Sequence, residues 1–347
     1  MNTEIKPIKY VLPFNFRDGM VQVATRKGMG YANKKGELVI PCEYDLTYPF
    51  SEGLAFVKKQ DSGAFINKSG DVVLSGDYTD ADVFMDGFAT VVKDGQWGFI
   101  NKKGEQVIPY IYDDVLWFSE GLCGVVKNDK AGFINTKGEV VVPLEYDDVL
   151  AFNEGLGQVC KENKWGCVDA LGNIVIPMEY TIVGECRNGL ICVEKEGKLI
   201  VLNKSGEEVF SSPYEFVEEV FNEGLLVVRH ERKYGCINER GEIVIPFEYD
   251  DLRNFKEGLA VAQKSGRWGF INKNNEQVIP LQYIKASDFN DGLAYVNTGK
   301  RKSYYIDKEN KAHIVLTKEY NTMEKITAAL VVVAVLGAAV YWISKLF

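Results

Sequence analysis

The amino-acid sequence predicts an all-β tandem repeat protein with three short strands in each repeat unit. One glycine column recurs nine times at intervals of 34 residues, with a single interval of 35: Gly19, Gly53, Gly87, Gly121, Gly155, Gly189, Gly224, Gly258 and Gly292. The segments between these glycines are about five residues long and rich in β-branched and aromatic residues, and Gly and Pro interrupt them too often for a stable helix. Because a unit of this size cannot bury its own apolar face, neighbouring units must stack on one another.

Each unit contains the same three strand segments in the same order, with the patterns Gly-Leu-Ala-x-Val, Trp-Gly-Phe-Ile-Asn and Val-Ile-Pro. The second and third segments are linked by Asn-x-x-Gly, as in Asn101 to Gly104. This link suits a type I turn whose last residue has a positive φ. The proline of the third segment, for example Pro109, cannot donate to a strand ladder, so we expect it at a strand end or on a sheet edge.

Two aromatic columns run through the units. The first lies three residues before the glycine and contains Phe16, Phe50, Phe84, Phe118, Phe152, Phe221, Phe255 and Phe289, with Cys186 as its exception. The second closes the units: Tyr44, Tyr78, Tyr112, Tyr146, Tyr180, Tyr214, Tyr249, Tyr283 and Tyr320. We expect both columns to pack between stacked units. The alternative is an aromatic ladder that stacks sugars or bases.

The sequence leaves two ways to arrange nine units. An open, twisted solenoid-like superhelix accommodates any number of units, whereas a closed propeller needs a fixed number and usually has four strands in about 40 residues per blade. The open array is therefore the first prediction, and propeller-like closure is the alternative. The extra residue between Ser211 and Val220 predicts a bend in the array.

The second strand segment carries a family resemblance. Residues 97–101 and 268–272 read Trp-Gly-Phe-Ile-Asn, and Trp165 is also followed by glycine. These segments resemble the WG (KWG) repeat family, which is found mainly in bacterial proteins. The resemblance implies a β-rich repeat that serves interactions. Several units depart from the pattern, because the Trp position holds Met29, Gly63, Ala131, Leu199, Tyr234 and Ser303 and the Gly position holds Ala64, Ile200 and Tyr304.

An acidic column precedes the glycine in most units: Asp18, Glu52, Asp86, Glu120, Glu154, Glu223, Glu257 and Asp291. Stacked units would place these carboxylates in a row, and one hypothesis is that the row binds Ca²⁺. The favoured interpretation is that the acid supports the turn and stays solvated, because the units lack the clustered acids of a calcium loop. The acidic pairs Asp113-Asp114, Asp147-Asp148 and Asp250-Asp251 are predicted to serve turns in the same way.

The C-terminal segment predicts a membrane anchor. Residues 326–344 contain no charged side chain, and 19 helical residues span about 28 Å, which is enough to cross a hydrocarbon core. The chain then divides into a lead-in at 1–13, nine repeats at 14–321 and an anchor at 322–347. Because no signal peptide is recognised in the first residues, we expect a single-pass, tail-anchored protein with a cytoplasmic array.

Composition and residue types argue against catalysis and against nucleic acid. The net charge is −9 and no basic stripe is present, so we expect no nucleic-acid partner. The seven cysteines fill apolar positions of the repeat and are predicted to be small buried hydrophobes. The two histidines, His230 and His313, are predicted to lie on the surface. We therefore expect no catalytic residue, no cofactor and no metal site.

The sequence favours one function over a second. The first hypothesis is a membrane-tethered, non-enzymatic scaffold whose extended surface binds an unknown protein partner, and the acidic composition makes basic segments plausible partners. The alternative is a sensor at the membrane that binds a ligand or an envelope glycan through exposed aromatic side chains.

Overall fold

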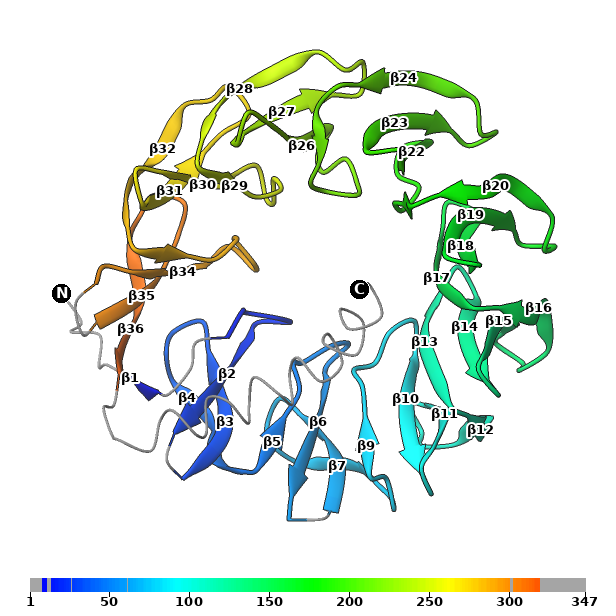
Figure 1. Ribbon diagram of the computed structural model, residues 1–347. Coiled ribbons are helices and arrows are strands. Elements are labelled where there is room, and N and C mark those ends of the chain that lie inside the picture. The colour runs from blue at the N-terminus through cyan, green and yellow to red at the C-terminus, as the bar shows by residue number, and fades with distance from the viewer. Residues whose placement is uncertain (1–7, 11–13, 26, 61, 300–301, 319–347) are drawn as a thin grey trace.

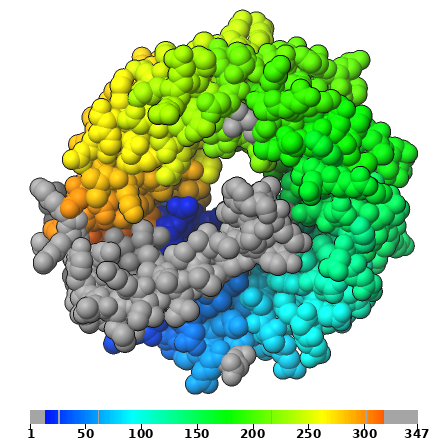
Figure 2. Space-filling view, viewed as in Figure 1, coloured from blue at the N-terminus to red at the C-terminus, as the bar shows by residue number. Residues whose placement is uncertain are grey.

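Nine β-sheets follow one another around a ring, and each sheet is built mainly from one repeat unit (Figure 1). The computed structural model describes residues 8–10, 14–25, 27–60, 62–299 and 302–318. We number the sheets blade 1 to blade 9 in chain order. In the space-filling view the blades coloured cyan to yellow close up side by side into a continuous wall (Figure 2).

Blade 1 shows three strands, which are β2 (Met20–Thr25), β3 (Gly28–Asn33) and β4 (Leu38–Tyr44). Blades 2 to 4 contain β5 (Leu46–Thr47), β6 (Leu54–Lys59), β7 (Ser62–Asn67) and β8 (Val72–Ser75); β9 (Asp80–Ala81), β10 (Phe88–Lys93), β11 (Gln96–Asn101) and β12 (Gln106–Tyr112); and β13 (Asp114–Ser119), β14 (Leu122–Lys127), β15 (Lys130–Asn135) and β16 (Val140–Tyr146). Blades 5 and 6 contain β17 (Asp148–Asn153), β18 (Leu156–Lys161), β19 (Lys164–Asp169) and β20 (Ile174–Tyr180); and β21 (Ile182–Val183), β22 (Leu190–Lys195), β23 (Lys198–Asn203) and β24 (Glu208–Ser212).

Blades 7 and 8 contain β25 (Glu215–Phe216), β26 (Leu225–His230), β27 (Lys233–Asn238) and β28 (Ile243–Tyr249); and β29 (Asp251–Leu252), β30 (Ala260–Lys264), β31 (Arg267–Ile271) and β32 (Gln277–Tyr283). Blade 9 contains β33 (Lys285–Ala286), β34 (Ala294–Asn297), β35 (Lys302–Ile306), β36 (Ala312–Lys318) and the N-terminal strand β1 (Ile8–Tyr10). Within blades 2 to 8 the strands pair in sequence order, and Figure 1 shows fourth strands such as β16 and β24 on the outer rim.

The prediction of three strands per unit is wrong, because the segment between the tyrosine and phenylalanine columns forms a fourth strand. This strand is only two residues long in most blades, as in β5, but reaches six residues in β13 and β17. A strand of two residues is too short to show an alternating hydrophobic pattern in the sequence. A unit of 34 residues holds four strands because its hairpin turns are short.

The open-array prediction is also wrong, and the alternative of propeller-like closure is confirmed. Blade 9 packs on blade 1: the Gly19 N–H donates to Asp291 Oδ2 at 2.7 Å, and the Phe16 and Tyr305 rings lie 5.0 Å apart. The Tyr305 hydroxyl also donates to the carbonyl of Phe14. On the outer edge of blade 9, β1 pairs in parallel with β36, in the register Ile8 with Leu316. The ring is closed by contacts between the first and last units.

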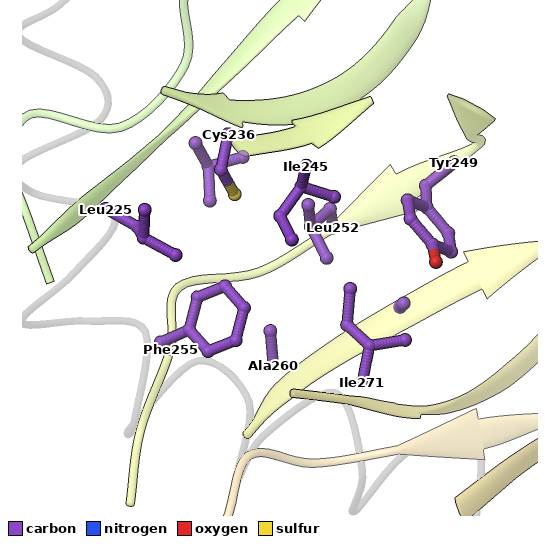
Figure 3. Packing of buried hydrophobic residues seen from close by; sticks show 10 residues of the cluster. Leu225, Cys236, Ile245, Tyr249, Leu252, Phe255, Ala260 and Ile271 are labelled. Atoms are coloured by element: carbon purple, nitrogen blue, oxygen red, sulfur yellow. The ribbon is translucent and has the colours of Figure 1, made fainter. Parts of the chain in front are cut away.

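The buried cores lie between blades rather than within them. Nine clusters of buried hydrophobic residues are present in the described residues, one for each junction, including the junction of blades 9 and 1. At the junction of blades 7 and 8, Cys236, Ile245 and Tyr249 of one blade meet Phe255 and Ile271 of the next (Figure 3). This arrangement confirms that a single unit does not bury its own apolar face.

The two aromatic columns mostly belong to these cores. Phe255 is 2% exposed and Tyr249 is 3% exposed. Packing is therefore the role of the described members of the columns, and the aromatic-ladder hypothesis is wrong for them; Tyr320 lies outside the described residues. The extra residue between Ser211 and Val220 does not interrupt the ring, since blades 6 and 7 share a core like the others.

Both turns of the repeat have the geometry that their residues favour. Asp18 and Gly19 have φ values of 52° and 78°, so they form a two-residue type I′ hairpin turn between Arg17 and Met20. The same pair of positive φ values occurs in all nine units. The Asn-x-x-Gly prediction is confirmed: the Gly104 N–H donates to the carbonyl of Asn101 at 2.9 Å, and Gly104 has a φ of 78°.

The glycine of the Trp-Gly pair makes room for the proline of the outer strand. In blade 8, Trp268 pairs with Tyr283 and Phe270 pairs with Ile279, so the outer strand holds two extra residues and bulges around Pro280. A Cβ atom on Gly269 would lie 2.6 Å from the carbonyl oxygens of both Ile279 and Pro280. Only glycine fits beneath this bulge.

The glycine and the proline are present together or absent together. Six blades have both: Gly30 and Pro41, Gly98 and Pro109, Gly132 and Pro143, Gly166 and Pro177, Gly235 and Pro246, and Gly269 and Pro280. Three blades have neither, and there the replacing residues pair directly with each other, without the register shift that the glycine has in the other blades: Ala64 with Ser75, Ile200 with Ser211, and Tyr304 with Val315. The Trp-Gly and Val-Ile-Pro motifs are thus two halves of one backbone feature.

The cysteines behave as the sequence predicts. All seven are free; six are buried, and Cys42 is half-buried. Burial raises the pKa of the Cys236 thiol to about 12. Thiols of this kind are inert packing groups at neutral pH.

Candidate interaction site between blades 4 and 5

The acidic column links successive blades through hydrogen bonds, which we call the acidic latches. Seven of its eight carboxylates accept a hydrogen bond from the backbone N–H of the glycine in the next blade around the ring: Asp18 from Gly53, Glu52 from Gly87, Glu120 from Gly155, Glu154 from Gly189, Glu223 from Gly258, Glu257 from Gly292, and Asp291 from Gly19. The column therefore does more than support its own turn, because it ties successive blades together.

Lysines and backbone N–H groups occupy the oxygens that a calcium ion would need. Lys68 pairs with Asp18 at 2.6 Å and Lys102 pairs with Glu52 at 2.8 Å. The hydrogen bond from the Gly189 N–H is the largest influence on the pKa of Glu154. Together with the hydrogen bond from the Asn188 N–H, it holds this pKa below its ordinary value, although partial burial acts to raise it. Among the residues that the structure describes, no group of three or more His, Cys, Asp or Glu side chains could hold a metal ion.

A pocket of about 130 Å³ opens between blades 4 and 5. Its lining comes from the start of β13, the adjoining part of β14, the hairpin after β14 and the start of β17: Asp113, Asp114, Val115, Leu116, Gly124, Val126, Asp129, Asp147, Asp148 and Val149. The acidic latches lie at the opposite end of β13, so the pocket is on the other face of the ring. We call this pocket the slot.

At this junction Gly124 replaces a side chain that is present in the other units, and Leu116 and Val149 pack over the glycine. The residue three positions after the column glycine, which is Gly124 in blade 4, is Gln22, Phe56, Thr90, Gln158, Cys192, Val227, Val261 or Tyr295 in the other units. Gln22 and Gln158 show what this side chain does, since their amides donate to the carbonyls of Thr47 and Val183 in the next blade at 2.5 and 2.9 Å. At the junction of blades 4 and 5 the matching carbonyl belongs to Val149, and residue 124 has no side chain to reach it.

The floor of the slot is apolar. A Cβ atom on Gly124 would lie 2.7 Å from Leu116 Cδ1 and 2.8 Å from Val149 Cγ2, so these side chains lie directly over the glycine. Val149 is 2% exposed, whereas Leu116 and Val126 are half-buried. An aliphatic group entering the slot would therefore be in contact with hydrocarbon.

Five aspartates surround the mouth. Asp113 and Asp147 each cap a hairpin, accepting from Asn128 N–H at 2.7 Å and from Glu162 N–H at 2.8 Å. This confirms their predicted turn role. Asp114 and Asp148 accept from the backbone N–H of the residue that follows each of them, and Asp129 is exposed in the hairpin after β14.

The carboxylates make the slot electronegative at neutral pH. The ion pair with Lys130 and the hydrogen bond from Glu162 hold the pKa of Asp147 below its ordinary value, so Asp147 is ionised. Burial, followed by the charges of Asp148 and Asp147, raises the pKa of the Cys160 thiol to about 11. The raised pKa of Cys160 thus reflects, after burial, the negative potential of these aspartates.

The surroundings of the two histidines do not indicate a functional site. His230 is exposed, as the sequence predicts, and its ring lies 5.4 Å from that of Tyr214 and 5.5 Å from that of Phe247. His313 is half-buried and lies 2.6 Å from Asp307 Oδ2. Neither arrangement contains a nucleophile.

Sequence reasoning identified the Asp-Asp pairs but missed that two of them flank a slot. The available signal was a glycine inside a strand segment, Gly124, between acidic pairs in two successive units. An isolated glycine in a strand marks a bulge or a close approach of other groups. Here it marks the close approach of Leu116 and Val149.

The nine blades around one axis define a closed β-propeller. The WG-containing repeat family matches residues 29–61, 64–97, 97–130, 132–165, 165–198, 234–268 and 268–301. These segments cover more than half of the chain, and the protein belongs to this family. A search of curated proteins gives no match.

One solved structure supports the fold, and a second is included for comparison. A crystal structure of the eukaryotic initiation factor is similar with a TM-score of 0.61, at 9% identity, over 86% of this chain and 96% of that one. The computationally designed Ika8 protein has a TM-score of 0.46, at 13% identity, over 74% of this chain and 94% of that one. At such low identity, the first of these likenesses shows the fold alone.

The described residues include no helix that is long and apolar enough to cross a membrane. The apolar segment 326–344, on which the anchor prediction depends, lies outside the described residues.

Proposed function

We propose that this protein is a non-enzymatic interaction scaffold, tethered to a membrane by residues 326–344, with its ring in the cytoplasm. The ring fold supports the scaffold part of this proposal, because a propeller presents many loops on one rigid frame. The uncharged sequence of the terminal segment supports the tether.

One observation carries the scaffold proposal: the recurring residues pack inside the ring, and the most exposed large side chain beside them lies at a position that varies between units. This position, four residues before the glycine, holds Asn15, Pro49, Val83, Trp117, Ala151, Glu185, Val220, Asn254 and Asp288. It is exposed at Asn15 and Trp117, half-buried in most other units and buried at Ala151, and Trp117 is 45% exposed whereas the neighbouring Phe118 is 2% exposed. A frame with fixed packing and variable surface positions suits recognition of a particular partner.

Photo-crosslinking tests the scaffold proposal. We expect p-benzoylphenylalanine in place of Trp117 to give a discrete crosslinked product in cells, because this exposed aromatic residue lies on the innermost strand beside the slot. The matched control is the same substitution at Val209, which is 48% exposed on the outer rim. A crosslinking pattern that is the same from both positions, or absent from both, would contradict a localised partner site.

Fractionation and thiol labelling test the tether. We expect the full-length protein to pellet with membranes and the protein without residues 323–347 to stay soluble, because the apolar segment supplies the attachment. In the full-length protein, Ser69→Cys introduces an exposed thiol, whereas six of the native cysteines are buried. A membrane-impermeant maleimide should label this thiol only after the cells are permeabilised. Pelleting of the truncated protein would refute the tether, and labelling in intact cells would refute the cytoplasmic orientation.

A further inference from the structure

We infer that the latch face of blades 3 to 5 binds a basic segment of a partner protein, whose lysine or arginine side chains replace two lysines that these blades lack. The latch face is the face of the ring that carries the acidic column, and blades 3 to 5 lie in the cyan-to-green part of the ring (Figure 1). This inference rests on the proposed scaffold function and specifies the chemistry of the partner.

Most acids of the column pair with a lysine from the next blade around the ring, in the turn that leads into the outer strand. In five pairs the ammonium nitrogen lies between 2.6 and 3.8 Å from the carboxylate: Lys68 with Asp18, Lys102 with Glu52, Lys273 with Glu223, Lys308 with Glu257, and Lys34 with Asp291. In the last three pairs the ammonium also donates to the backbone carbonyl of the same acid, at 2.6 or 2.7 Å. The repeat therefore builds a site for one ammonium group.

The acid and the lysine change together at one junction. In blade 6 the acid is replaced by Asn188, and in blade 7 the lysine is replaced by Glu239. Here the Asn188 amide donates to the Glu239 carboxylate at 3.2 Å. Loss of the acid is thus accompanied by loss of the lysine, which indicates that the lysine at this position serves the acid.

Two consecutive acids of the column have no such lysine. At the lysine position blade 4 has Thr136 and blade 5 has Ala170, whereas the acids of the preceding blades, Asp86 and Glu120, are retained and exposed. Among the ion pairs of the described residues, none involves Asp86 or Glu120. Glu120 still accepts two backbone N–H groups of the next blade, each at 2.7 Å. The carboxylates remain, but the positive charge that other blades place beside them is missing.

The same three blades expose large apolar side chains at positions that are otherwise variable or polar. Met85, directly before Asp86, is 40% exposed, and its position holds Arg, Ser, Asn or Lys in the other units. Leu171, in the turn of blade 5, is 81% exposed, and its position holds Lys, Ser, Arg, Asn or Glu in the other units. Trp117 lies three residues before Glu120 and is 45% exposed. Exposed Met, Leu and Trp side chains in one sector of a surface are typical of a protein contact.

This combination selects a partner that carries both cationic and apolar side chains. An exposed ion pair alone contributes little to affinity, and a wholly apolar segment would cover Asp86 and Glu120 without pairing their charges. A lysine or arginine would donate to these carboxylates, while its aliphatic stem packs beside Met85 or Leu171. The cationic head of such a side chain also suits the ring face of Trp117. The chain's net charge of −9 favours encounter with a basic segment.

A binding measurement with defined peptides tests the inference. The full-length protein in nonionic detergent is titrated into fluorescein-labelled peptides in which two Lys-Leu pairs are separated by Gly-Ser spacers of graded length. Matched peptides carry acetyl-lysine or glutamate in place of lysine. We expect the best lysine peptide to bind at least tenfold more tightly than either matched peptide. Equal binding of the acetyl-lysine peptide would overturn the inference, because acetyl-lysine keeps the aliphatic stem and lacks the charge.

Filling the two lysine positions from within provides the decisive variant. Thr136→Lys combined with Ala170→Lys installs the residue that other blades already accommodate, and we expect it to weaken binding of the lysine peptide at least tenfold. Ser69→Lys combined with Ser205→Lys is the matched control, because it adds the same charge at the next position of the turn in two other blades. This control should change binding less than twofold. Similar losses in both variants would show general charge repulsion and refute the site.

A second pair of variants keeps the inference testable if the added lysines disturb folding. Asp86→Asn combined with Glu120→Gln removes the two charges, and we expect at least fivefold weaker binding of the lysine peptide. Asp18→Asn combined with Glu52→Gln removes the same charges from two blades whose lysines are in place, and it should change binding less than twofold. Unchanged binding in the first variant would refute the site. A crosslinked product from position 117 in cells would then leave the scaffold proposal standing without it.

Discussion

Replacing Phe16 by alanine is expected to destabilise the protein by about 3–5 kcal/mol, the usual cost of removing a large buried aromatic side chain. Phe16 is 2% exposed at the junction of the first and last blades, where its ring meets that of Tyr305. Loss of the Phe16 ring would weaken the junction of blades 9 and 1, the seam at which the ring closes. Urea denaturation followed by tryptophan fluorescence measures the effect.

Phe255→Ala is the matched control for the seam, because Phe255 is also 2% exposed and holds the same position at an internal junction. A closed ring requires both substitutions to be costly, since each residue is buried between two blades. If Phe255→Ala were costly and Phe16→Ala nearly neutral, the first and last blades would not be in contact in solution. That result would restore the open array.

Gly269→Ala is expected to cost about 1–3 kcal/mol through overpacking, although alanine ordinarily suits a strand better than glycine. The added methyl would lie 2.6 Å from two backbone carbonyl oxygens of the bulge, and backbone cannot move aside as a flexible side chain can. The free energy of unfolding from urea titrations gives the cost.

The second substitution, Pro280→Ser, should recover part of that loss. In blade 2, Ala64 pairs directly with Ser75, so the double variant Gly269→Ala/Pro280→Ser has a precedent within the same chain. We expect a favourable coupling between the two substitutions in a double-mutant cycle. Strict additivity would mean that the glycine and the proline are not parts of one feature. The reverse control, Ala64→Gly, should cost no more than about 1 kcal/mol.

The sequence predicts the repeat, its turns and its buried columns, because these depend on local chemistry that recurs nine times. A positive φ at Gly104 follows from the Asn-x-x-Gly pattern, and burial of Phe255 follows from its column. Closure does not follow in the same way. Closure depends on the small rotation between successive blades, and this rotation cannot be read from the sequence of a single unit. It also depends on inner strands as short as Leu46–Thr47.

The site was harder to predict than the fold for a related physical reason. Asp113 and Asp147 are 34 residues apart, and their turn role is visible from the neighbouring residues of each. The slot depends instead on side chains of two successive blades, since Leu116 of one and Val149 of the next meet over Gly124. Such a meeting becomes visible only when the neighbouring blade is in place.

The position of β1 has a consequence for biosynthesis. Ile8 pairs with Leu316 and Gly19 donates to Asp291, 272 residues further along the chain. Residues 8–19 therefore leave the ribosome well before the segments with which they pair have been made. Until then the nascent chain presents the apolar flank of blade 1, with Phe16, to solvent. Contacts over so many residues form slowly, which makes this flank the natural point of engagement for a chaperone and the natural starting point for association between unfinished chains.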